Sequence, residues 1–117
     1  MRNFKELSIW QRSHQLVLKI YLSTRSFPQD ELFGLISQMK RSSSSVPTNI
    51  AEGCGRNSDA ELGRFLTIAS GSISELEYQV LLAKDLGYLP ENLSKELTDE
   101  IIEIRKMIYS FIHKLKS

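Results

Sequence analysis

Cysteine is nearly absent from this 117-residue sequence, which contains a single copy, Cys54. One cysteine cannot form an intramolecular disulfide, so the chain is not a disulfide-stabilised secreted scaffold. Long apolar runs are missing too. No stretch approaches the roughly 20 residues of a membrane-spanning helix, and the N-terminal MRNFKELSIW mixes charges into its apolar residues. We therefore expect a cytoplasmic protein that does not enter a membrane.

Histidine is also scarce, and neither copy lies in the spacing that metal chemistry requires. A di-iron site in a helical bundle needs Glu-x-x-His pairs. Here Gln11 stands three positions before His14, and Ser110 stands three positions before His113. The Gly-Cys-Gly segment at 53–55 lacks the Lys-Ser/Thr ending of a phosphate-binding loop. The sequence therefore predicts no metal site, no cofactor and no enzymatic activity.

A strong net charge of either sign is missing as well. Fifteen Lys and Arg residues face fourteen Asp and Glu residues, which leaves a formal net charge of +1. The chain as a whole is thus not a strongly basic nucleic-acid binder. The charges are unevenly distributed, because residues 1–57 carry eight cations against four carboxylates and residues 58–117 carry seven against ten. Any basic surface must be local.

Apolar residues make up 41% of the chain and recur at the three- and four-residue steps of amphipathic helices. The length suits a single domain over residues 1–117. Short connections between the helical segments favour antiparallel neighbours. We expect an all-α, antiparallel up-down-up-down four-helix bundle, with helices at about 8–25, 29–54, 59–86 and 91–115.

Residues with special backbone preferences mark the predicted helix ends. Pro28 suits the first turn of the second helix, because its fixed backbone angle is helical and its missing donor would be unbonded there. Ser58 and Glu61 form a capping box at the start of the third helix. Gly87 favours the left-handed conformation that ends that helix.

The second predicted helix contains an internal proline, Pro47. Proline removes the backbone hydrogen bond to the carbonyl of Ser43 and costs about 3 kcal/mol in a regular helix. We expect a kink there, with neighbouring serines bonding the freed carbonyls. The small side chains at 42–45 would let another helix approach closely, and the third helix offers matching small residues, namely Ala69, Ser72 and Ala83.

The residues after this proline form an unusual motif of Pro47, Asn49, Glu52 and Gly53. In a structural interpretation, Asn49 and Glu52 bond the backbone groups that Pro47 frees, or cap the next helix. In a functional interpretation, the same corner of the fold binds phosphates through nearby cations, and the candidates are Lys40, Arg41, Arg56 and Arg64. Four such cations would bind nucleic acid in a salt-dependent way and read little base sequence.

The third predicted helix carries apolar residues beyond its core-facing stripe. These residues are Phe65, Ile68, Leu82 and Leu86. They could widen the core face of the helix. They could equally form the patch through which bundles meet, because contiguous exposed apolar surface often marks an interface. We take them as candidate residues of an oligomer interface.

Three segments of the chain carry a family resemblance: FKELSIWQRS at 4–13, FGLISQMKRSSSSVPTNIAEGCGR at 33–56, and FLTIASGSISELEYQVLLAKDLGYL at 65–89. They resemble the 23S rRNA intervening-sequence protein family of bacteria. The likeness covers roughly residues 4–89. Its most specific part is the proline-containing segment with its Asn-Ile-Ala-Glu-Gly ending.

This resemblance implies a non-enzymatic four-helix bundle that is commonly assembled as a ring-like homopentamer. It also relates the chain to the accessory protein of diversity-generating retroelements, which is strongly basic and binds nucleic acid and a reverse transcriptase. The near-neutral charge here departs from that branch. We expect a homo-oligomer that binds RNA or DNA through a local basic surface. The alternative is a structural or adaptor protein that binds another protein without nucleic acid.

Overall fold

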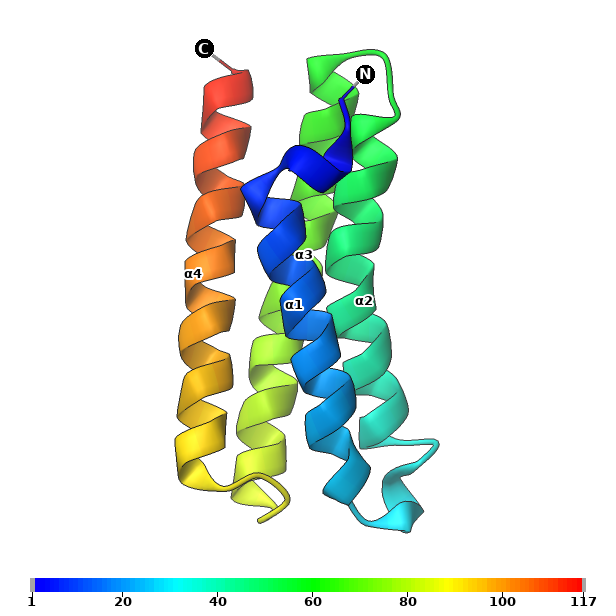
Figure 1. The fold of residues 1–117 in the computed structure, drawn as a ribbon, viewed down its shortest axis with the longest axis vertical. Helices are drawn as coiled ribbons and strands as arrows, with labels where there is room; N and C mark the ends of the chain where they lie inside the picture. Colours follow the sequence, from blue (N-terminus) through cyan, green and yellow to red (C-terminus); the bar gives the residue numbers. More distant parts are fainter. Residues whose placement is uncertain (1, 117) are drawn as a thin grey trace.

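The structure is a computed structural model and describes residues 2–116. Within these residues it contains four long helices and no strand: α1 (Ser8–Ser23), α2 (Leu35–Cys54), α3 (Asp59–Asp85) and α4 (Glu91–Leu115). Successive helices run antiparallel in an elongated bundle of 44 × 23 × 20 Å (Figure 1). The expected all-α, up-down-up-down four-helix bundle is confirmed.

The two ends of the bundle differ in what they contain. Both chain termini and the turn between α2 and α3 lie at one end, the upper end in Figure 1. The α1–α2 and α3–α4 connections lie at the lower end. The N-terminal segment is bound to the upper end, because the Arg2 N–H donates to the Cys54 carbonyl at 2.9 Å. The Arg2 guanidinium also pairs with Asp59 at 3.5 Å.

The expected start of the second helix at residue 29 is wrong, because α2 begins at Leu35. Pro28 is extended (φ −56°, ψ 142°), and the short 3-10 turn Gln29–Glu31 follows it. Gly34 then takes a backbone conformation outside the helical region. The Glu31 carboxylate accepts a hydrogen bond from the Leu35 N–H at 3.2 Å and so caps the later start. At the end of α1, the helix stops at Ser23 and the 3-10 turn Thr24–Ser26 follows.

The boundaries of the third helix agree with the sequence signals. The Ser58 hydroxyl accepts a hydrogen bond from the Glu61 N–H at 3.1 Å, as a capping box requires. Gly87 adopts a left-handed φ of +81° directly after α3. An L side chain would be strained at this position, which explains why glycine follows the helix here.

The core runs the length of the bundle and is built from aliphatic side chains of all four helices. Its fully buried members recur at helical spacing and include Leu16, Ile20, Met39, Ile50, Leu66, Ile73, Leu76, Leu97, Ile101, Ile104 and Ile108. Each such side chain contributes about 1.5–3 kcal/mol of burial free energy relative to exposure. This apolar interior accounts for the cohesion of the bundle.

Helices α2 and α3 are bridged by small and polar side chains, as the serine run suggested. The hydroxyls of Ser45 and Ser72 lie 2.8 Å apart, and the Ser42 hydroxyl donates to the Gln79 side-chain oxygen at 2.5 Å. Gly53 is buried inside α2 and does not end it. A Cβ added there would lie 2.9 Å from side-chain atoms of Leu62 and Phe65. Glycine therefore permits the close approach of the two helices.

Helix α2 continues without interruption through Pro47, whose ring is buried. The nearby hydroxyls of Ser42, Ser43 and Ser44 donate to carbonyls three residues earlier, those of Met39, Lys40 and Arg41. These bonds lie in the turn before the carbonyl that Pro47 leaves unbonded, so the serines do not compensate for it as expected. The bend at Pro47 stays a prediction.

Replacing Gly53 with alanine should destabilise the bundle. The added methyl group overlaps Leu62 and Phe65, and overpacking of this kind costs about 1–3 kcal/mol. The better helix propensity of alanine offsets up to about 1 kcal/mol of that cost. Chemical denaturation should therefore show Gly53→Ala to be less stable than the parent chain by about 1–2 kcal/mol.

The matched control is Gly71→Ala in α3, where an added Cβ meets nothing within 4 Å. This substitution should stabilise the protein by about 0.5–1 kcal/mol. If both variants gained stability to the same extent, close packing at Gly53 would not be the reason for its glycine.

Candidate nucleic-acid interface

The structure brings two of the predicted cations together at the upper end. Arg56 follows α2 and Arg64 lies in the second turn of α3. Their guanidinium carbons lie 4.9 and 5.1 Å from the centre of the same ring, that of Phe65. The Phe65 side chain is only 8% exposed. Its ring thus serves as a fixed surface that holds two exposed guanidinium groups next to each other.

The other two predicted cations lie elsewhere, which corrects the expectation of one cluster. Lys40 and Arg41 belong to the second turn of α2, towards the lower end. At 1.5 Å per residue, the helix separates Arg41 from Arg56 by about 22 Å. The Lys40 ammonium lies 4.8 Å from the ring centre of Tyr21 on α1. The four cations therefore form two separate pairs.

A groove of about 450 Å³ lies beside the Arg56–Arg64 pair, between the start of α3 and the end of α4. Arg64 and Lys116 line it from opposite helices, together with Thr67 and the Asp59 carboxylate, which pairs with Arg2. Ala60 and Gly63 also line the groove, so its α3 side carries little side-chain bulk. We call Arg56, Arg64 and Lys116 the cationic corner. An extended anionic chain could lie in this groove with cations on both sides.

Sequence reasoning missed Lys116. Its signal was available, because lysines concentrate at the C-terminal end of the last helix, and antiparallel packing of α3 and α4 sets that end beside the start of α3. The sequence alone does not give the distance between the start of α3 and the end of α4, because that distance depends on how the core packs.

Two carboxylates near the cationic corner are engaged by cations, whereas the exposed Glu61 in the first turn of α3 has no ion-pair partner within residues 2–116. Glu52 accepts a hydrogen bond from Arg56 at 2.9 Å, and Asp59 pairs with Arg2 at 3.5 Å. In residues 2–116 neither Arg64 nor Lys116 has a carboxylate partner. Both ion pairs are exposed, and such pairs contribute only about 0–1 kcal/mol. A phosphate could therefore displace Glu52 from Arg56 at small cost.

The motif after Pro47 serves the packing of α2. The Asn49 amide donates to the backbone carbonyl of Ser45 at 2.8 Å and to the Ser45 hydroxyl at 2.9 Å, and that hydroxyl contacts Ser72. Asn49 thus extends the polar bridge between α2 and α3. Glu52 instead holds Arg56, one turn further along. Asn49 thus bonds the Ser45 carbonyl and not the Ser43 carbonyl that Pro47 frees, and Glu52 pairs with Arg56 of the cationic corner.

The four candidate interface residues do not form one exposed patch. Phe65 is buried beneath the two arginines, and Leu82 is half-buried against the core. Ile68 is 44% exposed and Leu86 49%, but eighteen residues of helix separate them by about 27 Å. The expected patch is divided because Phe65 and Leu82 are covered by neighbouring side chains, whereas Ile68 and Leu86 are exposed far apart.

Cys54 is buried, and the loss of solvent around the thiol raises its pKa, with the nearby Arg2 charge acting in the opposite direction. The thiol is therefore held in its less reactive protonated form. Within residues 2–116, no three His, Cys, Asp or Glu side chains come together in a group that could hold a metal ion. None of the helices described has both the length and the apolar character needed to cross a membrane.

A family model described as 23S rRNA-intervening sequence protein matches residues 5–110. The chain belongs to this family. The match extends through most of α4, beyond the segments that carry the resemblance in the sequence. The chain also shares its fold with a solved protein from Bacteroides thetaiotaomicron VPI-5482. That protein has unknown function and is described as a member of the S23 ribosomal protein family.

That structural neighbour superposes with a TM-score of 0.80 at 24% sequence identity, over 89% of this chain and 97% of the other. At this level of identity the likeness concerns the fold. No curated protein shows significant sequence similarity to this member of the 23S rRNA-intervening sequence protein family.

Replacing Asn49 with alanine should lower stability and leave nucleic-acid binding unchanged. The substitution removes two hydrogen bonds within the α2–α3 bridge, each worth about 0.5–1.5 kcal/mol. The neighbouring exposed Thr48 provides the control, since Thr48→Ala should change stability by no more than about 0.5 kcal/mol. A loss of nucleic-acid affinity in Asn49→Ala without a loss of stability would favour the functional interpretation instead.

Proposed function

We propose that this protein is a non-catalytic, homo-oligomeric module that binds nucleic acid through the cationic corner. The observation that supports this best is the position of Arg64 and Lys116 on opposite sides of one groove. Arg56 lies beside them on the same aromatic ring as Arg64. Two cations therefore face one groove, and a third shares the aromatic ring that supports one of them.

The chemistry of the corner suits phosphates. Arginine binds phosphate oxygens through paired N–H donors, and lysine adds a point charge. The corner offers few neutral amide or aromatic groups for reading base edges, because Phe65 is covered. Binding should thus depend on the backbone of RNA or DNA and show little sequence preference.

Assembly would strengthen such binding. Three phosphate contacts give weak affinity, and several copies on one strand raise the effective concentration of each corner. The proposal therefore includes self-association, with the ring-like homopentamer implied by the family resemblance as its expected form. The buried, unpaired Cys54 thiol is compatible with the reducing cytoplasm as the place of action.

Titration of a structured RNA, a single-stranded DNA and a duplex DNA by fluorescence polarisation tests the proposal. Binding should be measurable at low salt and weaken roughly 20-fold for single strands and roughly 40-fold for duplex DNA between 50 and 200 mM salt, as expected for about three phosphate contacts. The double variant Arg56→Glu with Arg64→Glu should lose at least tenfold in affinity.

The charge-matched control is Lys19→Glu with Lys106→Glu, which changes net charge equally on the α1–α4 side, away from the cationic corner. This control variant should retain most of the affinity of the parent chain when the two are compared in the same oligomeric state. No binding at low salt, or equal losses in the two double variants, would show that the cationic corner is not the site.

A second candidate function is that of an adaptor which binds another protein, such as a reverse transcriptase, without nucleic acid. The net charge of +1 and the exposed apolar side chains favour this alternative. Pull-down from cell extract with and without nuclease separates the two. A partner that survives nuclease treatment and is retained by Arg56→Glu with Arg64→Glu supports the adaptor, whereas loss of all partners after nuclease supports nucleic-acid binding.

A further inference from the structure

Phe33 is the most exposed large apolar side chain of the structure, at 93%. It lies in the α1–α2 connection at the lower end, beside the exposed Leu32. The end of α1 adds three more exposed apolar residues. We call these five the α1–α2 face: Leu18, Tyr21, Leu22, Leu32 and Phe33. Solvent exposure on this scale is unfavourable for a monomer and is typical of an interface.

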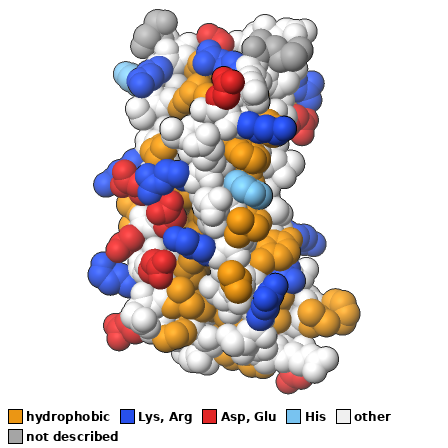
Figure 2. All heavy atoms as spheres, viewed as in Figure 1, with side chains coloured by type: hydrophobic (Ala, Val, Ile, Leu, Met, Phe, Trp, Pro, Cys, Tyr) orange, Lys and Arg blue, Asp and Glu red, His pale blue; other side chains and the backbone are white. Residues whose placement is uncertain are grey.

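Cations surround the α1–α2 face. Arg25 and Lys40 line a shallow pocket with Leu32, and Arg41 is exposed on the adjoining turn of α2. The nearby Glu31 is occupied, since it caps Leu35 and accepts a hydrogen bond from the Tyr88 hydroxyl at 3.0 Å. Figure 2 shows Lys, Arg and apolar side chains gathered over this lower part of the molecule. The exposed Asp30 in the same connection offsets one of these positive charges. The face is therefore apolar with a net positive rim.

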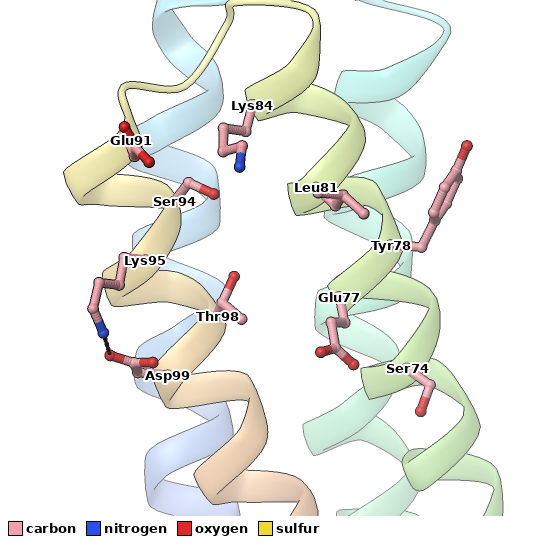
Figure 3. Close-up of a pocket in the computed structure, with 10 residues that line it drawn as sticks. All are labelled: Ser74, Glu77, Tyr78, Leu81, Lys84, Glu91, Ser94, Lys95, Thr98 and Asp99. Carbon is pink, nitrogen blue, oxygen red and sulfur yellow. Dashed lines mark hydrogen bonds and ion pairs between the residues drawn. The ribbon is translucent and has the colours of Figure 1, made fainter.

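A complementary surface lies between α3 and α4. A groove of about 550 Å³ opens there, and Tyr78 and Leu81 are its exposed apolar residues (Figure 3). Ser94 and Thr98 line the facing side of α4 and leave room for a bulky side chain. Because Lys84 and Glu91 flank the α3–α4 turn, the groove lies at the lower end, at the same level as Phe33.

The rim of this groove is more negative than positive. Glu91 lines it, and Asp85 is exposed on α3 one turn after Leu81. Neither carboxylate pairs with a cation in the part of the chain that the structure describes. Lys84 is the one positive side chain of the groove that is not in an ion pair among the described residues. Two further carboxylates of the groove are paired: Glu77 with Arg105, and Asp99 with Lys95. The groove thus offers an apolar floor with a net negative border.

The two surfaces lie on opposite sides of the same bundle. Helix α1 packs against α2, α2 against α3, and α3 against α4, so the α1/α2 side faces away from the α3/α4 side. The chain's charges follow this division, because its first half is net positive and its second half net negative. Copies standing side by side in the same direction would bring unlike charges and two apolar surfaces together.

A two-fold contact is less favourable. It would set the α1–α2 face against itself and oppose Arg25, Lys40 and Arg41 with their own copies, which is repulsive. Head-to-tail packing avoids this repulsion. It also leaves the cationic corners free, since these lie at the other end of each bundle.

We propose that the α1–α2 face of one copy docks, with Phe33 as its anchor, into the α3–α4 groove of the next copy in a repeating head-to-tail contact. This inference rests on the self-association included in the proposed function and names the surfaces that produce it. In such an array all bundles point the same way, so the cationic corners share one side of the assembly and can bind one strand of nucleic acid together.

Two single variants, each measured by light scattering and sedimentation, test the contact. Phe33→Glu blocks the α1–α2 face, and Leu81→Glu blocks the groove. Both positions are exposed, so both variants should fold with parent-like circular dichroism. Each alone should be monomeric at concentrations where the parent chain is oligomeric, with self-association at least tenfold weaker.

Mixing the two variants distinguishes a head-to-tail contact from a two-fold contact. Phe33→Glu retains an intact groove and Leu81→Glu retains an intact face, so an equimolar mixture should form a one-to-one dimer and nothing larger. Failure of the mixture to pair, after each variant alone has become monomeric, would overturn the head-to-tail geometry in favour of a two-fold contact.

The control is Ile68→Glu, an exposed apolar position of α3 outside both surfaces. It should leave the assembly intact. If Ile68→Glu dissociates the assembly, or if Phe33→Glu and Leu81→Glu stay oligomeric, the proposed surfaces are wrong while self-association stands. A parent chain that is monomeric at micromolar concentration would refute both this contact and the self-association in the proposed function.

Discussion

The close contact between α2 and α3 is the constraint on which the rest of the structure depends. Gly53 lacks the methyl group that would collide with Leu62 and Phe65, and Ser42 and Ser45 bond to partners on α3. Buried polar groups need hydrogen-bond partners, and within residues 2–116 no buried side-chain nitrogen or oxygen lacks one. The contact therefore holds the two helices at one separation and one register.

The cationic corner follows from that register. With α2 and α3 held together, the turn between them sets Arg56 and Arg64 on the ring of Phe65. The N-terminal segment then closes the upper end by bonding Cys54 and pairing with Asp59. A bundle with a looser α2–α3 pair would leave these guanidinium groups without a common support.

The two ends of the bundle differ in surface character. Exposed apolar side chains concentrate at the lower end, where the α1–α2 and α3–α4 connections lie, and the cationic corner occupies the upper end. Such a division allows one end to serve contacts between copies while the other meets an anionic partner.

The sequence by itself determined the fold class, the four helices and the ends of α3, because apolar periodicity, Ser58 and Gly87 act locally or through simple repetition. It did not place the start of α2, where Glu31 and Gly34 override the signal of Pro28. The rise of a single helix already separates Lys40 and Arg41 from Arg56. Only the tertiary structure set Arg56 and Arg64 on one ring and added Lys116 to Arg64. The reason is physical: side chains distant in sequence become neighbours only when packing sets the separation and rotation of whole helices.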